Sequence, residues 1–258
     1  MGDIESGDSD LSDSKATAFF DLVPTIKTAC WPNCFARQIG DIVVIHATRH
    51  ISGGQEMTIA KEDDLDLSEC RANDGSGCEC PLHEAENLQR PERIKTKRTI
   101  LERLICGMGT DVKHNVLDQF GRFQIWDKIL AELDEAYSDV PRGMPKVVKA
   151  QACLLMVNFI TEKGKDREAI AKQVILAELG LECLGYRYDV KSEEPKILKY
   201  GVMCSQALTF MEIAAQGSQA LQESNANAYS WMLKKLWTIF YAADSSELDT
   251  DAVVCSAR

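Results

Sequence analysis

The sequence predicts a mainly α-helical protein in which a short β segment and a cysteine-rich loop precede an array of helices. Between residues 91 and 243, apolar residues recur with a helical period. Residues 42–45 form a β-branched run, Ile-Val-Val-Ile, that is typical of a strand. Cysteine and histidine residues gather at 30–34 and 78–83, with the short spacing that metal ligands need.

Charge is distributed unevenly over the 258 residues. The net charge is −11, and fourteen acidic residues lie in three stretches, at 3–13, 62–69 and 244–251, without a Lys or Arg among them. The remaining 26 acids and 29 bases nearly balance. Without a basic face, direct nucleic-acid binding is not expected. We expect residues 1–15 and 244–258 to be disordered tails and residues 62–90 to be an acidic loop and a zinc loop.

No apolar run approaches the ~20 residues that a bilayer span requires, and the polar N-terminal residues do not resemble a signal peptide. The sequence therefore predicts no membrane segment. We expect an intracellular protein, nuclear or cytoplasmic or both.

The β segment is expected within residues 16–61. Residues 16–23 predict a short strand or helix that ends before Pro24. Residues 39–47 predict a buried strand, and Met57-Thr-Ile59 predicts a second, short one. Gly53 and Gly54 supply the turn between them.

The helical domain is expected to span residues 91–243 with six helices. Gly107 and Gly109 mark the exit of the first helix, and Asp166 is the expected N-cap of the fourth. The six helices are expected at 91–109, 117–137, 147–160, 168–184, 197–215 and 231–240.

Short links between the helices predict antiparallel helix pairs. Small residues are expected where these helices cross, at Ala150, Ala152, Ala207 and Ala214. Tetratricopeptide-like geometry is one form that such an array can take, although no clean repeat of about 34 residues is found. Such an array suggests a surface for a protein or peptide partner.

The ten cysteines fall into two groups. Cys106, Cys153, Cys183 and Cys204 lie in helical apolar patterns, where a thiol is expected to pack as a small hydrophobic group. Cys70, Cys78 and Cys80 lie instead in a polar stretch and need a different explanation.

A structural zinc site is that explanation. Two cysteines one residue apart and a third ligand three positions later, Cys78, Cys80 and His83, can reach one ion from a tight loop. The fourth ligand is expected to be Cys30 or Cys34. Four protein ligands leave no open position for a water nucleophile, so the zinc would be structural.

These residues carry a resemblance to a known family. The sequence Cys30-Trp-Pro-Asn-Cys34, followed by Gly54-Gln-Glu-Met-Thr-Ile59, resembles the C-terminal half of a SET domain. The element Cys78-x-Cys80-x-x-His83 resembles the post-SET zinc loop. The helical domain after it is similar to that of the SET and MYND-type subgroup. The resemblance implies that zinc is held by Cys30, Cys78, Cys80 and His83.

The same resemblance implies protein-lysine methylation with S-adenosylmethionine, but three features depart from the family pattern. Lys27-Thr-Ala29 replaces the Asn-His-Ser that helps to hold the methyl donor, and Lys61 replaces the tyrosine of the lysine channel. The glycine-rich N-terminal half of the SET domain has no counterpart before residue 16. Methyl transfer depends on positioning and on exclusion of water, which these changes would weaken.

Three functional hypotheses follow. The first is a truncated or degenerate SET-domain protein, inactive alone, that acts as a zinc-stabilised protein-interaction module and has no catalytic residue of its own. The second is a protein (histone) lysine methyltransferase that works as part of a longer chain or complex and binds S-adenosylmethionine. The third is an unrelated zinc-stabilised helical adaptor.

Overall fold

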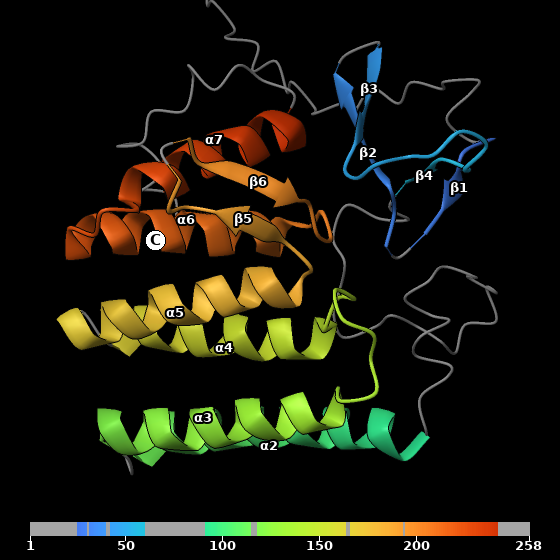
Figure 1. Cartoon of the computed structure of the whole chain (residues 1–258). Coiled ribbons are helices and arrows are strands. Elements are labelled where there is room, and N and C mark those ends of the chain that lie inside the picture. Colours follow the sequence, from blue (N-terminus) through green and yellow to red (C-terminus); the bar gives the residue numbers. More distant parts are fainter. Residues whose placement is uncertain are drawn as a thin grey trace, which may run out of the picture.

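The computed structural model describes residues 25–29, 31–39, 42–59, 91–114, 118–163, 166–192 and 194–241, and it confirms the mainly helical fold (Figure 1). The helices in this part of the chain are α2 (Pro91–His114), α3 (Gln119–Ala136), α4 (Val147–Lys163), α5 (Arg167–Cys183), α6 (Ser205–Leu221) and α7 (Ala226–Tyr241). The expected tails, 1–15 and 244–258, and the 62–90 loop lie outside the described residues.

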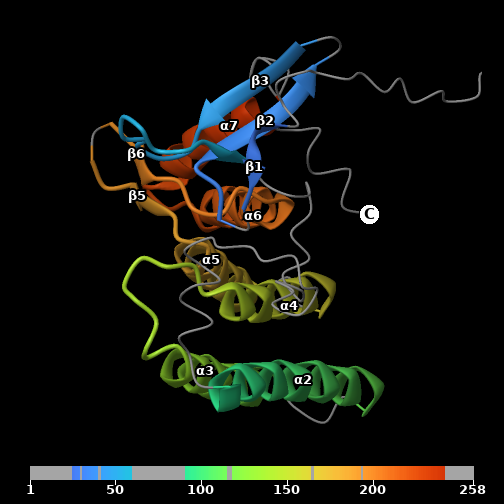
Figure 2. The same cartoon turned by 90° about the vertical axis from the view of Figure 1, so that its right-hand side faces the viewer.

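Successive helices pair and the pairs stack in layers. In Figures 1 and 2, α2 and α3 form one end of the stack, α4 and α5 lie in the middle, and α6 and α7 form the other end. Short links within each pair make its two helices antiparallel. The four alanines expected at crossings, Ala150, Ala152, Ala207 and Ala214, are fully buried. Tetratricopeptide-like geometry stays a prediction.

Helix α2 is longer than the sequence predicted. It continues through Gly107 and Gly109, which were expected to end it, and reaches His114. Neither glycine has any atom within 4 Å of the position that its missing Cβ would occupy, so both lie on the open side of the helix. The buried positions Ile100 and Leu104 anchor the helix before the two glycines, and this packing outweighs the ~1 kcal/mol that each interior glycine costs.

Helix α3 is joined to α4 by a charged cluster around Asp134. This carboxylate accepts hydrogen bonds from Lys146, at 2.9 Å, and from Lys149, whose side chain is only 5% exposed. Burial alone would raise the pKa of Asp134, but the hydrogen bonds and charges of the two lysines outweigh it and hold that pKa below its usual value.

The lowered pKa of Asp134 predicts a pH-dependent effect of the Asp134→Asn substitution. A depressed carboxyl pKa contributes stability above the unfolded-state value of about 4, and this stability is lost as the pH falls through the folded-state value. The substitution should therefore destabilise the protein at neutral pH and have a much smaller effect near about pH 3. Urea unfolding across this range measures the difference. In a background that carries both Lys146→Met and Lys149→Met the pH dependence should largely disappear, and its persistence there would contradict the assignment.

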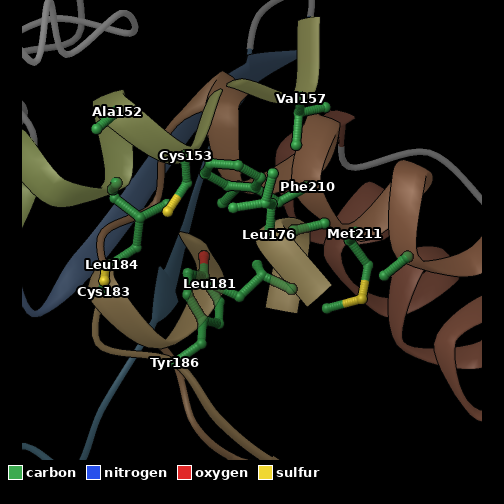
Figure 3. Packing of buried hydrophobic residues seen from close by; sticks show 14 of the residues in the cluster. Ala152, Cys153, Val157, Leu176, Leu181, Cys183, Leu184, Tyr186, Phe210 and Met211 are labelled. Carbon is green, nitrogen blue, oxygen red and sulfur yellow. The ribbon is translucent and has the colours of Figure 1, made fainter. Parts of the chain in front are cut away.

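Helices α5 and α6 approach closely because glycines lie at their contact. A methyl group at Gly180 of α5 would lie 2.4 Å from Cζ of Phe210, and one at Gly217 of α6 would lie 2.4 Å from a methyl carbon of Val174. Figure 3 shows the Phe210 ring among side chains of α4 and α5, including Cys153 and Leu176. This contact forms the centre of the hydrophobic core.

A β-hairpin between α5 and α6 was not predicted. Strands β5 (Arg187–Asp189) and β6 (Lys196–Lys199) pair antiparallel, and the helix expected from residue 197 begins only at Ser205. The side chain of Asp189 accepts backbone hydrogen bonds from Lys191 and Ser192, which forms the turn. Gly201 ends the hairpin against the backbone of α5, where Val202 N donates to Leu184 O at 2.8 Å.

The N-terminal β segment contains two strand pairs: β1 (Lys27–Thr28) with β4 (Thr58–Ile59), parallel, and β2 (Cys34–Ile39) with β3 (Ile42–Ala47), antiparallel. Residues 16–24 lie outside the described part. The β2–β3 hairpin contacts α7, where the Phe35 and Phe240 rings lie 4.8 Å apart. The prediction that the β-branched run is buried was wrong, because Ile42 is 66% exposed and Ile45 37%. The buried anchor of the hairpin is Phe35 on β2.

The helical cysteines differ from one another in exposure. Cys153, Cys183 and Cys204 are buried as predicted, although Cys204 is the N-cap of α6 and not an interior residue. Burial raises the pKa of the Cys153 thiol, and it raises that of Cys183 to about 12. The prediction for Cys106 was wrong, because this residue lies on the exposed side of α2.

This difference predicts selective alkylation. Because the thiolate is the reactive form, N-ethylmaleimide should label Cys106 of the folded protein at least ~100-fold faster than Cys153 or Cys183. Peptide mass spectrometry after timed labelling measures the rates, and in denaturant all three should react alike. Equal rates in the folded protein would show that α4 and α5 open readily.

Among the described residues, no helix is both long enough and apolar enough to cross a membrane.

Candidate functional site

The Asn33 turn joins the two segments that carry the sequence motif. The side-chain amide of Asn33 donates to Glu56 O at 2.9 Å, and its Oδ1 accepts from Thr58 N at 2.7 Å. The backbone N–H of Asn33 donates to Oγ1 of Thr58 at 3.0 Å, and its carbonyl accepts from Thr48 N at 2.9 Å. Asn33 is 1% exposed, so these bonds satisfy polar groups that water cannot reach.

The residues before the turn are tied to the same segment. Strand β1 runs parallel to β4, with Thr28 opposite Ile59, and Ala29 N donates to Ile59 O at 2.9 Å. The backbone on both sides of position 30 is therefore connected to residues 56–59. Cys30 itself lies outside the described residues.

Trp31 lies beside the turn and is covered by cationic side chains. The guanidinium carbon of Arg49 lies 4.6 Å from the centre of the Trp31 ring, and Nη2 of Arg49 donates to Trp31 O at 3.2 Å. Nζ of Lys199, from strand β6, lies 5.1 Å from the same ring centre. These contacts attach the β segment to the hairpin of the helical domain.

All four expected zinc ligands, Cys30, Cys78, Cys80 and His83, lie outside the described residues, so the site stays a prediction. Within the described ranges, no group of three or more potential ligands gathers around one point. The alternative ligand Cys34 is 1% exposed and lies at the start of β2. Burial raises the pKa of its thiol, against smaller opposing effects of Arg49 and a backbone hydrogen bond to Thr58.

The residues that stand at the family's donor-binding positions are also visible. Both strand residues of β1 are exposed, and Nζ of Lys27 pairs with Glu56 Oε2 at 2.9 Å. Glu56 thus has a structural role, as its carbonyl also accepts from Asn33. Lys61, which the resemblance sets at a channel tyrosine position, lies outside the described residues.

Sequence reasoning missed Lys199, which the hairpin brings to Trp31, and Arg187, which lies with Lys199 beside Gly143. They lie about 160 residues from Trp31 in the sequence, and the stretch that contains Lys199 was assigned to a helix. The signal that could have identified the strand was its punctuation, because Pro195 and Gly201 bound a run that is too short for an ordinary helix.

A scan against protein-family models finds no match to this chain, and a search of curated proteins finds no similar sequence.

Proposed function

We propose that this protein is a SET-related, zinc-stabilised interaction module that does not transfer methyl groups by itself. The observation that carries the proposal is the Asn33 turn. Two stretches that resemble SET motifs, at 30–34 and 54–59, lie side by side and are joined by hydrogen bonds of one buried amide. If the resemblance to SET motifs were accidental, there would be no reason for these two stretches to contact each other in the fold.

The residues at the donor positions support the inactive form of the proposal. Methyl transfer needs a sulfonium donor and an amine held in line in a dry channel. Lys27 is exposed, positively charged and paired with Glu56, and so offers neither the amide nor the imidazole of the family motif. A cationic side chain beside a cationic donor would also oppose binding.

The α2–α3 pair, at one end of the helix stack, offers a surface on which a protein partner could bind. A depression of about 660 Å³ lies between α2 and α3, lined by charged and polar side chains such as Glu92, Lys95, Thr99 and Glu132, with Ile100 among them. Alternating charges around a small apolar floor suit a peptide segment of mixed composition.

Titration calorimetry with S-adenosylmethionine, and with S-adenosylhomocysteine as a second titrant, tests the inactive form directly. We expect no saturable heat up to millimolar donor on folded, zinc-loaded protein. A dissociation constant near micromolar, about −8 kcal/mol, would instead favour a lysine methyltransferase that acts in a longer chain or complex.

Zinc analysis tests the SET relationship separately. Cys30→Ser should lower the zinc content of the purified protein, and Cys106→Ser, which removes an exposed thiol on α2, should not. Unchanged zinc in the Cys30→Ser protein would favour the unrelated zinc-stabilised helical adaptor.

A further inference from the structure

Two cationic side chains converge beside Gly143, in the loop between α3 and α4. Nζ of Lys199 and Nη2 of Arg187 both lie within 3.7 Å of the position that a Cβ of Gly143 would occupy. Gly143 adopts a φ of +84°, which favours glycine, and its carbonyl accepts a hydrogen bond from Lys199 at 3.1 Å. The absence of a side chain at Gly143 leaves space between the two cations and the loop.

A third cation joins them across Trp31. Arg49 and Lys199 both lie over the Trp31 ring, at 4.6 and 5.1 Å from its centre. Positive charges from the segment after β3 and from strand β6 thus contact one indole ring, and strand β5 adds Arg187 beside Lys199.

Within the described residues, no carboxylate lies within ion-pair distance of Lys199 or Arg187. Burial, followed by the charges of Arg187 and Arg49, holds the pKa of Lys199 below its usual value. The cations therefore repel one another, and a bound anion would convert this repulsion into attraction.

We propose that Lys199 and Arg187 form an oxyanion-binding site that takes a carboxylate or phosphate group next to Trp31. A guanidinium can bind two oxygens of such a group at once, and an ammonium contributes a point charge. Arg187 is exposed, so a ligand can reach the site from solvent. The inference does not depend on zinc or on a methyl donor, and it stands apart from the proposed function.

The first test is titration of inorganic phosphate into the full-length protein at low ionic strength, followed by calorimetry and by the melting temperature. The net charge of −11 disfavours general attraction of anions, so saturable binding would indicate a local site. We expect binding that raises the melting temperature with phosphate concentration. Lys199→Gln and Arg187→Gln should each weaken it at least ~10-fold.

Lys196→Gln is the matched control. It removes the same charge from the same strand, but its side chain is three residues from Lys199 and points to the other face of the hairpin. Its affinity for phosphate should equal that of the unaltered protein. Circular dichroism and the melting temperature without phosphate establish that each variant is folded.

A synthetic peptide of glutamate residues, titrated in parallel, distinguishes the sources of the oxyanion. Tighter binding of the peptide than of phosphate, lost in Lys199→Gln, would identify a carboxylate from an acidic peptide. Tighter binding of phosphate, with the same loss, would identify a phosphate ligand. Absence of binding of both probes, or an equal loss in Lys196→Gln, would overturn the proposal.

Discussion

Replacing Phe210 with alanine is expected to lower the free energy of unfolding by about 4 kcal/mol, because it removes a fully buried ring from the centre of the core. The ring lies against Gly180 of α5, and their close approach allows the middle and final helix layers to pack. Urea unfolding followed by circular dichroism measures the loss. Phe120→Ala on α3 is the matched control, since Phe120 is 64% exposed, and it should change stability by less than about 0.5 kcal/mol.

A double-mutant cycle tests the contact itself. Gly180→Ala alone should destabilise the protein by about 2 kcal/mol, since the new methyl group would overlap the Phe210 ring. In the Phe210→Ala background the same substitution should instead be neutral or stabilising, as alanine is the better helix former by about 1 kcal/mol. Additive effects of the two substitutions would show that these residues do not contact each other.

Replacing Asn33 with alanine is expected to destabilise the β segment by about 3 kcal/mol, as Thr58 N and Glu56 O lose their hydrogen-bond partner. The effect should be local, because the turn is tied to residues 56–59 and not to the helix stack. Hydrogen exchange should therefore show faster exchange at the Thr58 amide, with the amides of α5 and α6 little changed.

Asn227→Ala is the control for this substitution. Asn227 lies exposed in the first turn of α7, and its replacement should leave Thr58 exchange unaltered. Unchanged Thr58 protection in the Asn33→Ala protein would mean that the parallel β1–β4 pairing holds the segment without the amide.

The helices were the most predictable part of the fold, because apolar residues recur with the helical period on the face that packs against the core. Helices α3, α4 and α5 lie close to their predicted limits, whereas α7 begins at Ala226, before the predicted start at residue 231. Asp166 caps α5 through a hydrogen bond from Ala169 N at 2.8 Å. Errors arose where tertiary contacts outweighed local signals. Glycines did not end α2, since Ile100 and Leu104 anchor the helix before them and the buried Asp111, beyond them, pairs with Arg122.

The hairpin and the turn depend on contacts between distant residues, and such contacts leave little trace in a single sequence. Residues 197–200 have an apolar content that fits helix or strand, and only the pairing with β5 decides between them. The motif around Asn33 could be found from its residues, but not the geometry of its amide. The convergence of Lys199 and Arg187 on Gly143 had no sequence signal.

The parallel pairing of β1 with β4 has a consequence for conformational entropy. Its partners, Lys27 and Thr58, are joined by a long excursion that contains the whole β2–β3 hairpin. Closing a flexible loop of this length costs about 3 kcal/mol, and two residue pairs of strand cannot offset that cost alone. Formation of the β2–β3 hairpin shortens the effective loop, and the hydrogen bonds of the Asn33 side-chain amide hold the two ends of that loop together. The β1–β4 pairing therefore depends on cooperative assembly and not on local strand preference.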